Sequence, residues 1–251
     1  MKIGIIGFGN LGRALASGLL LSGFPAGDIY ICDNSPEACS AAESDYHINA
    51  SYDTAFVIGA TDTVFLTVKS YVFEELAHGI DRESLIGKVI ISFMAGVSFE
   101  RIYSLIGNVE LVRGMPSLAI AQCEGVIGYT KAPTAIAEVF HKLGYAFEAE
   151  PEDIEKVMAF SSCGLGFAAY LIDTFAAAGQ TMGFSPETAS KIAAMTFKNA
   201  VDRGAFCDTI RAVATPGGAT EQGVIHMDNS GVYGIVADAV RKAYERMAGG
   251  S

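Results

Sequence analysis

Six residues near the start of the chain have the types and spacing of a phosphate-binding turn, GFGNLG at positions 7–12. An apolar run of strand length precedes them and a helical pattern follows at once. Gly7 permits a tight turn, Gly9 lets the backbone approach a pyrophosphate, and Gly12 lets the helix pack close to the strand. The N–H groups that begin the helix would attract the phosphates. The pattern predicts a dinucleotide-binding turn, although a glycine-rich turn in another α/β domain is the alternative. The expected cofactor contacts here are Gly7, Phe8, Gly9, Asn10, Leu11 and Gly12.

An acidic residue ends the second apolar run, Asp28 to Cys32. Asp33 follows the glycines at about the 20-residue spacing at which a carboxylate binds the ribose 2′-hydroxyl. A carboxylate there repels a 2′-phosphate, and the next residues, Asn34 and Ser35, are not cationic. We therefore expect Asp33, Asn34 and Ser35 to contact NAD(H) or NADP(H), with NAD(H) slightly favoured. Asn34 and Ser35 could still bind a phosphate, and Asp33 could instead cap a helix before Pro36.

The composition bounds the class of protein. Hydrophobic residues make up 51% of the 251 positions, enough for a large buried core, and the net charge of −11 argues against nucleic acid as a partner. No apolar run of membrane-spanning length is uninterrupted and no signal pattern begins the chain, so we expect a cytoplasmic protein without a membrane partner. Five cysteines and four histidines are irregularly spaced, which predicts neither disulfides nor a metal site.

The chain divides near residue 150. Before it, β-rich runs such as Thr63–Val68 and Lys88–Phe93 alternate with helical stretches, a pattern typical of βαβ units and a parallel sheet. After it, the patterns are helical only. The predicted fold class is α/β: a Rossmann-type, dinucleotide-binding domain over residues 1–150 and an all-helical domain over residues 151–251.

One predicted helix, from about Ser162 to Met182, is apolar nearly all round. Such a helix must be buried on every side. We expect a partner subunit to cover it, with a helix wholly enclosed by its own domain as the alternative.

Six motifs are spread over the chain: GFGNLG, Val68-Lys69, ISFMAGVS (91–98), VRGMPS (112–117), AGQTMGFSPETA (178–189) and ATPGGAT (214–220). Taken together, they resemble the pyrroline-5-carboxylate reductase family over the full length of the chain. The resemblance implies a Rossmann domain followed by a helical substrate and dimerisation domain that interlocks with a second subunit. It also implies reduction of a cyclic imine carboxylate, most simply 1-pyrroline-5-carboxylate to L-proline in proline biosynthesis, in a homodimer or larger even-numbered assembly.

The resemblance assigns the substrate site to the TPGGAT segment. Pro216 would end one helix, and Gly217 and Gly218 would expose N–H groups for a carboxylate at the start of the next. Thr220 matches the family threonine whose hydroxyl bonds the ring nitrogen, and is the expected catalytic residue. An ordinary turn between helices is the alternative. The expected substrate contacts are Gly217, Gly218, Ala219 and Thr220, and the further cofactor contacts implied are Val68, Lys69, Met94, Ala95, Met115 and Pro116.

The chain departs from the family pattern at Ser117, Leu165 and Ala212, all near the implied pockets. Two other functions therefore stay open. One is a different Rossmann oxidoreductase of the same two-domain plan, acting on another imine or a 3-hydroxyacid. The other is a non-catalytic regulatory paralogue.

Overall fold

The computed structural model describes residues 1–248, which form two compact units. The first unit comprises Met1–Ser162 together with residues 244–248, and the second comprises Cys163–Ala243. Residues 151–162 thus pack with the sheet-containing unit. The boundary at residue 150 between a cofactor-binding domain and a dimerisation domain concerns function rather than compactness, and it stays a prediction.

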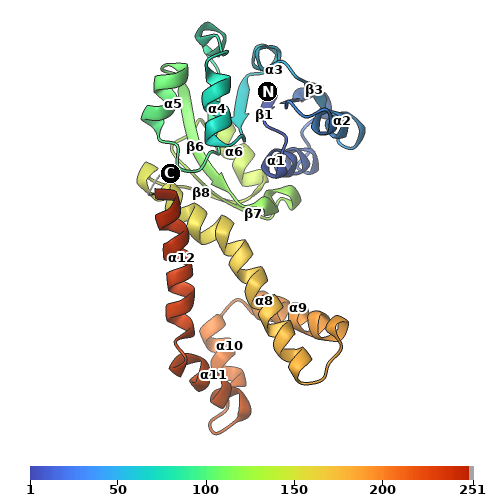
Figure 1. Ribbon diagram of the computed structural model, residues 1–251, viewed down its shortest axis with the longest axis vertical. Helices are drawn as coiled ribbons and strands as arrows, with labels where there is room; N and C mark the ends of the chain where they lie inside the picture. Colours follow the sequence, from blue (N-terminus) through green and yellow to red (C-terminus); the bar gives the residue numbers. More distant parts are fainter. Residues whose placement is uncertain (249–251) are drawn as a thin grey trace. The chain divides into compact units, whose positions relative to one another are not determined.

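The first unit is built on one eight-stranded sheet of order β3-β2-β1-β4-β5-β6-β7-β8 (Figure 1). The strands are β1 (Ile3–Ile6), β2 (Ile29–Cys32), β3 (Asn49–Ser51), β4 (Thr63–Leu66), β5 (Val89–Ser92), β6 (Glu110–Pro116), β7 (Gly125–Tyr129) and β8 (Gly144–Glu148). The chain leaves β1 toward β2 on one side, while β4 lies on the other side. Ligands of open α/β sheets bind at such a reversal, beyond the carboxyl ends of the strands.

The sheet is mostly parallel, as the sequence predicts, with one exception. Strand β7 runs antiparallel to β6, and β8 is parallel to β7. Only residues 117–124 connect β6 to β7. A parallel neighbour needs a crossover of about a dozen residues or more. The short connection therefore forces the chain to turn back, which the alternating pattern did not reveal.

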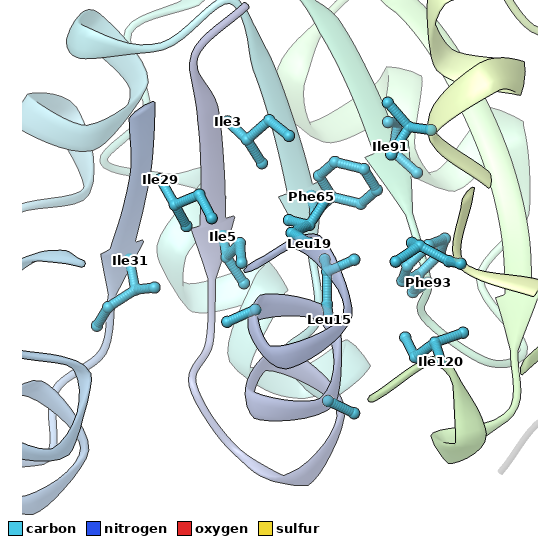
Figure 2. Close-up of a cluster of buried hydrophobic side chains, with 14 of the residues drawn as sticks. Ile3, Ile5, Leu15, Leu19, Ile29, Ile31, Phe65, Ile91, Phe93 and Ile120 are labelled. Atoms are coloured by element: carbon cyan, nitrogen blue, oxygen red, sulfur yellow. The ribbon is translucent and has the colours of Figure 1, made fainter. Parts of the chain in front are cut away.

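Helices cover both faces of the sheet, because neighbouring strand residues point to opposite sides. Ile3 and Ile5 of β1 pack with Leu15 and Phe65 on one face, while Ile6 packs on the other. Figure 2 shows the first of these clusters. The helices of this unit are α1 (Asn10–Leu21), α2 (Pro36–Ser44), α3 (Thr54–Ala60), α4 (Ser70–Ala77), α5 (Phe99–Ile106), α6 (Thr134–Lys142) and α7 (Ile154–Val157). The predicted α/β class is confirmed.

The second unit is helical throughout its described residues. Its helices are α8 (Cys163–Thr181), α9 (Pro186–Arg203), α10 (Phe206–Val213), α11 (Ala219–Asn229) and α12 (Val232–Ala248), the last of which ends in the first unit. Helices α8 and α9 pack together, with the rings of Phe175 and Phe197 5.8 Å apart.

The apolar helix α8 is not enclosed by its own domain. Ala176 is its one buried residue, while Leu165, Tyr170 and Phe175 are exposed within the single chain. The alternative of an internally enclosed helix is therefore wrong. The pattern was right that α8 is apolar nearly all round, and little of that surface is covered by the rest of its own unit.

One helical stretch, Pro151–Thr181, is long and apolar enough to cross a membrane, judged by length and composition alone. This differs from the expectation of no such stretch, because that expectation considered only uninterrupted apolar runs, and polar residues interrupt this one. A core helix of a soluble protein meets the same criteria.

Candidate cofactor and substrate sites

The glycine-rich turn lies between β1 and α1, and the surroundings of its three glycines differ. Gly7 has φ of 99°, and a Cβ on it would lie 2.7 Å from the Val68 side chain. A Cβ on Gly12 would lie 2.1 Å from the Gly7 carbonyl oxygen. A Cβ on Gly9 would meet nothing within 4 Å. The fold itself thus requires Gly7 and Gly12, whereas Gly9 borders open space.

The N-terminus of α1 has no acidic or capping side chain. Gly9 occupies the N-cap position without a side-chain hydrogen bond, and the first turn contains no acid. The amides of residues 10–12 have no acceptor within the helix because they belong to its first turn. Helices α2 and α3, in contrast, are capped by Ser35 and Asp53. The start of α1 therefore presents free donors and the positive end of a helix dipole, which suit a phosphate.

A cavity of about 470 Å³ opens at the carboxyl ends of the central strands, beside this turn. Its position matches the crevice expected where the strand order reverses. Seven of the residues predicted to bind the cofactor line it: Gly7, Gly9, Asn10, Asp33, Asn34, Val68 and Lys69.

Asp33 is held in place by two backbone amides. Its carboxylate accepts hydrogen bonds from the Phe8 N–H at 2.6 Å and from the Ser35 N–H at 2.9 Å. Asp33 does not cap α2, because Ser35 is the cap and accepts from the Ala38 N–H. Each carboxylate oxygen retains a further lone pair for a ligand hydroxyl. The carboxylate is thus fixed at the cavity wall and joins the glycine-rich turn to the end of β2.

Two aromatic residues that the sequence analysis missed also line this cavity. Tyr52 and Tyr71 are 63% and 62% exposed, and the Lys69 Nζ lies 6.0 Å from the Tyr71 ring centre. Tyr52 directly follows β3, so its place after a strand end was a usable signal. Exposed aromatic faces in a cavity can stack on a base.

Cys32 also lines the cavity, where its thiol is unreactive. Burial raises the pKa of its thiol, and the sulfur lies 3.3 Å from the Thr54 hydroxyl. The thiol is therefore protonated at neutral pH. It serves as a small neutral wall rather than a nucleophile.

The remaining predicted cofactor residues do not line this cavity. Phe8 is 1% exposed, with its ring 5.3 Å from that of Tyr46, so only its backbone faces the turn. Met94 and Met115 are buried in the core. The residues in this group are Phe8, Leu11, Gly12, Ser35, Met94, Ala95, Met115 and Pro116.

A buried ion pair supports the end of β5. The Arg113 guanidinium on β6 lies 2.6 Å from the Glu155 carboxylate of α7, and the two side chains are 4% and 15% exposed. The same guanidinium donates to the Met94 carbonyl at 3.4 Å. The sequence analysis missed this pair, whose one signal was a charged residue inside an apolar strand. It ties α7 to the loop after β5.

The TPGGAT segment lies in the second unit, between α10 and α11. Gly217 has φ of 74°, and its N–H donates to the Glu221 carboxylate at 2.6 Å. The Gly218 N–H donates to the Thr215 carbonyl at 2.8 Å. Both glycine amides therefore have acceptors in the chain, which differs from the expectation that they are exposed.

Helix α11 begins directly after these glycines. Gly218 is its N-cap without a side-chain bond, and Ala219 and Thr220 are exposed in its first turn. Their amides have no acceptor within the helix. The start of α11 thus still offers donors, two positions later than the Gly217 and Gly218 amides that were expected to provide them. Within residues 1–248, no three His, Cys, Asp or Glu side chains gather as metal ligands would.

Two separate segments of the chain match two family models. Residues 151–249 match "Pyrroline-5-carboxylate reductase dimerisation", and residues 2–96 match "NADP oxidoreductase coenzyme F420-dependent".

Full-length relatives agree with these matches. The chain is 26% identical over 259 residues to the pyrroline-5-carboxylate reductase of Aquifex aeolicus, and 27% identical over 266 residues to that of Escherichia coli. Both alignments cover 98% of this chain and 96% of the relative. The crystal structure of Plasmodium falciparum pyrroline carboxylate reductase with NADP bound superposes with a TM-score of 0.89 at 20% identity, covering 99% of this chain and 97% of that one.

Proposed function

We propose that this chain, which belongs to the pyrroline-5-carboxylate reductase family, reduces 1-pyrroline-5-carboxylate to L-proline with a nicotinamide cofactor. The observation that carries the proposal is the match to reductases across nearly the whole chain, including the dimerisation segment. The reaction class is reduction of a C=N bond, as in amino-acid biosynthesis. A 3-hydroxyacid substrate and a non-catalytic role are not favoured.

The turn between β1 and α1 fits a dinucleotide. The amides of residues 10–12 would bind the pyrophosphate, and the open space at Gly9 would admit it. Asp33 would accept a hydrogen bond from the ribose. When bound, the reduced cofactor supplies hydride to the imine carbon. The protein's part is to hold both rings in reacting geometry.

The proposed preference between NADH and NADPH rests on Asp33. Its carboxylate is held by the amides of Phe8 and Ser35, so it cannot turn away from a 2′-phosphate. Lys69 is the one cationic side chain lining the same cavity, among the residues described. We infer a slight preference for NADH. The Plasmodium relative was crystallised with NADP.

The start of α11 is the proposed substrate site. The Thr220 hydroxyl would bond the ring nitrogen, and the amides of Ala219 and Thr220 would bind the carboxylate. Gly217 and Gly218 would join them if their present acceptors were exchanged for the ligand. A protonated imine is already electrophilic, so this site needs to orient the ring rather than supply a strong acid.

The helical segment from residue 151 onward is the proposed dimerisation domain, and residues 1–150 the cofactor domain. The exposed apolar residues of α8, such as Leu165, Tyr170 and Phe175, require cover. Asp173 within α8 is better placed between subunits than in lipid. We infer a homodimer or larger even-numbered assembly in the cytoplasm, with neither membrane nor nucleic acid as partner.

Activity and assembly can be tested on the purified chain. NADH absorbance should fall on addition of pyrroline-5-carboxylate, with proline as product, and not with a keto acid. Light scattering after size exclusion should give an even multiple of the 26.4 kDa chain mass. A folded monomer would contradict the dimerisation proposal, and no turnover of any cyclic imine would contradict the reductase proposal.

A further inference from the structure

The Glu221 side chain accepts a hydrogen bond from a backbone N–H of the proposed substrate site. Its carboxylate accepts a short hydrogen bond from the Gly217 N–H, at 2.6 Å, and bonds to an ionised acceptor are the stronger kind. Gly217 is one of the residues to which the resemblance assigns the carboxylate of the substrate. One carboxylate of the protein therefore lies where a carboxylate of the ligand is expected.

The local structure explains this contact. Gly217 adopts φ of 74°, which is accessible to glycine at little cost, and Gly218 then begins α11. Glu221 lies in the first turn of α11, where the helix dipole stabilises a negative side chain. The features that would attract the substrate carboxylate thus also hold Glu221.

A ligand carboxylate entering this loop meets two penalties. It must displace Glu221 from the Gly217 amide or leave that amide unused. It must also approach a negative charge, and two unit charges about 4 Å apart repel by about 1 kcal/mol even in water. A ring without a carboxylate meets neither penalty.

We infer that Glu221 is a specificity-determining residue that competes with the carboxylate of the substrate for the Gly217 amide. This inference rests on the proposed function, because it assumes that cyclic imines bind at the start of α11. Glu221 weakens binding of carboxylate-bearing rings and leaves binding of the uncharged ring unaffected. The enzyme therefore discriminates less between 1-pyrroline-5-carboxylate and 1-pyrroline than its amide-rich loop alone would.

The test is Glu221→Gln, which keeps an acceptor for the Gly217 N–H and removes the charge. Steady-state kinetics with pyrroline-5-carboxylate should show KM lowered roughly five- to tenfold. KM for 1-pyrroline and for NADH should not change. The matched control is Glu187→Gln, because Glu187 is also an acid in the first turn of a helix of this unit, α9. The control should leave all three KM values as in the wild type.

A second variant and a binding measurement separate the alternatives. If the Glu221 bond serves only to order the loop, Glu221→Gln will keep the wild-type KM and Glu221→Ala will raise it, which overturns the inference. An equal fall in KM for both imines overturns it as well. Calorimetric titration with L-proline, in the presence of NAD⁺, should give tighter binding to Glu221→Gln than to the wild type, whether or not turnover is seen.

The failure of this inference can be told from failure of the proposed function. A wild-type protein that reduces neither imine refutes the reductase proposal, while the proline titration still tests Glu221. In the other case, the wild type reduces pyrroline-5-carboxylate, and Glu221→Gln leaves the ratio of its KM for pyrroline-5-carboxylate to its KM for 1-pyrroline unchanged. That result refutes the role of Glu221 and leaves the reductase proposal standing. No proline binding by either form also refutes it.

Discussion

Replacement of Gly9 by valine should abolish cofactor binding while the fold survives. Gly9 has φ of −74° and an extended ψ, a conformation that valine adopts readily. A Cβ there meets no protein atom within 4 Å. The added methyl groups therefore extend only into the space proposed for the pyrophosphate.

The structure sets the expected magnitudes. Because the backbone of Gly9 suits an ordinary residue, the free energy of unfolding should stay within about 1 kcal/mol of the wild type. NADH affinity should fall at least about 100-fold, or roughly 2.7 kcal/mol. The matched variant is Gly12→Ala, whose Cβ would lie 2.1 Å from the Gly7 carbonyl oxygen. It should lose about 1–3 kcal/mol of stability, because the helix must shift.

Two assays separate these effects. Urea unfolding followed by circular dichroism reports stability. NADH fluorescence titration reports affinity, and the chain has no tryptophan to interfere. Near wild-type NADH affinity in Gly9→Val would refute the assignment of the turn. Strong destabilisation of Gly9→Val would refute the reasoning that Gly9 borders open space.

Three further variants test other parts of the argument. Asp33→Asn should shift the NADH to NADPH ratio of kcat/KM roughly five- to tenfold toward NADPH, because it removes one charge beside the 2′ position; a wild type that prefers NADPH would contradict this reading. Thr220→Ala should lower kcat/KM for pyrroline-5-carboxylate roughly 10- to 150-fold and leave NADH affinity unchanged. The fold-change corresponds to losing a hydrogen bond to a charged nitrogen, which contributes about 1.5–3 kcal/mol. Unaltered kcat/KM would exclude that role. Glu155→Gln should cost about 3–5 kcal/mol in urea unfolding, because Arg113 keeps a buried charge without its carboxylate; a loss under about 1 kcal/mol would mean that Arg113 finds another partner.

Local spacing in the sequence was enough to predict much of the first unit. The three glycines of GFGNLG, the strand before them and the helix after them lie within a few residues of one another, so their geometry follows from backbone conformation. The place of Asp33 follows from the same βαβ unit. The helical pattern after residue 150 predicted the helical domain, and the family resemblance, which rests on contiguous motifs, predicted the reaction class.

Tertiary structure decided what distant residues do together. The pairing of Arg113 with Glu155 joins residues far apart in the chain, and the cavity that Tyr52 and Tyr71 both line brings together the ends of two separate strands. Glu221 and Gly217 are close in sequence, yet their bond depends on how the turn enters α11. Spacing along the chain predicts which backbone N–H groups lack a partner within a helix. Which side chain then accepts a hydrogen bond from each of them is determined by the folded structure.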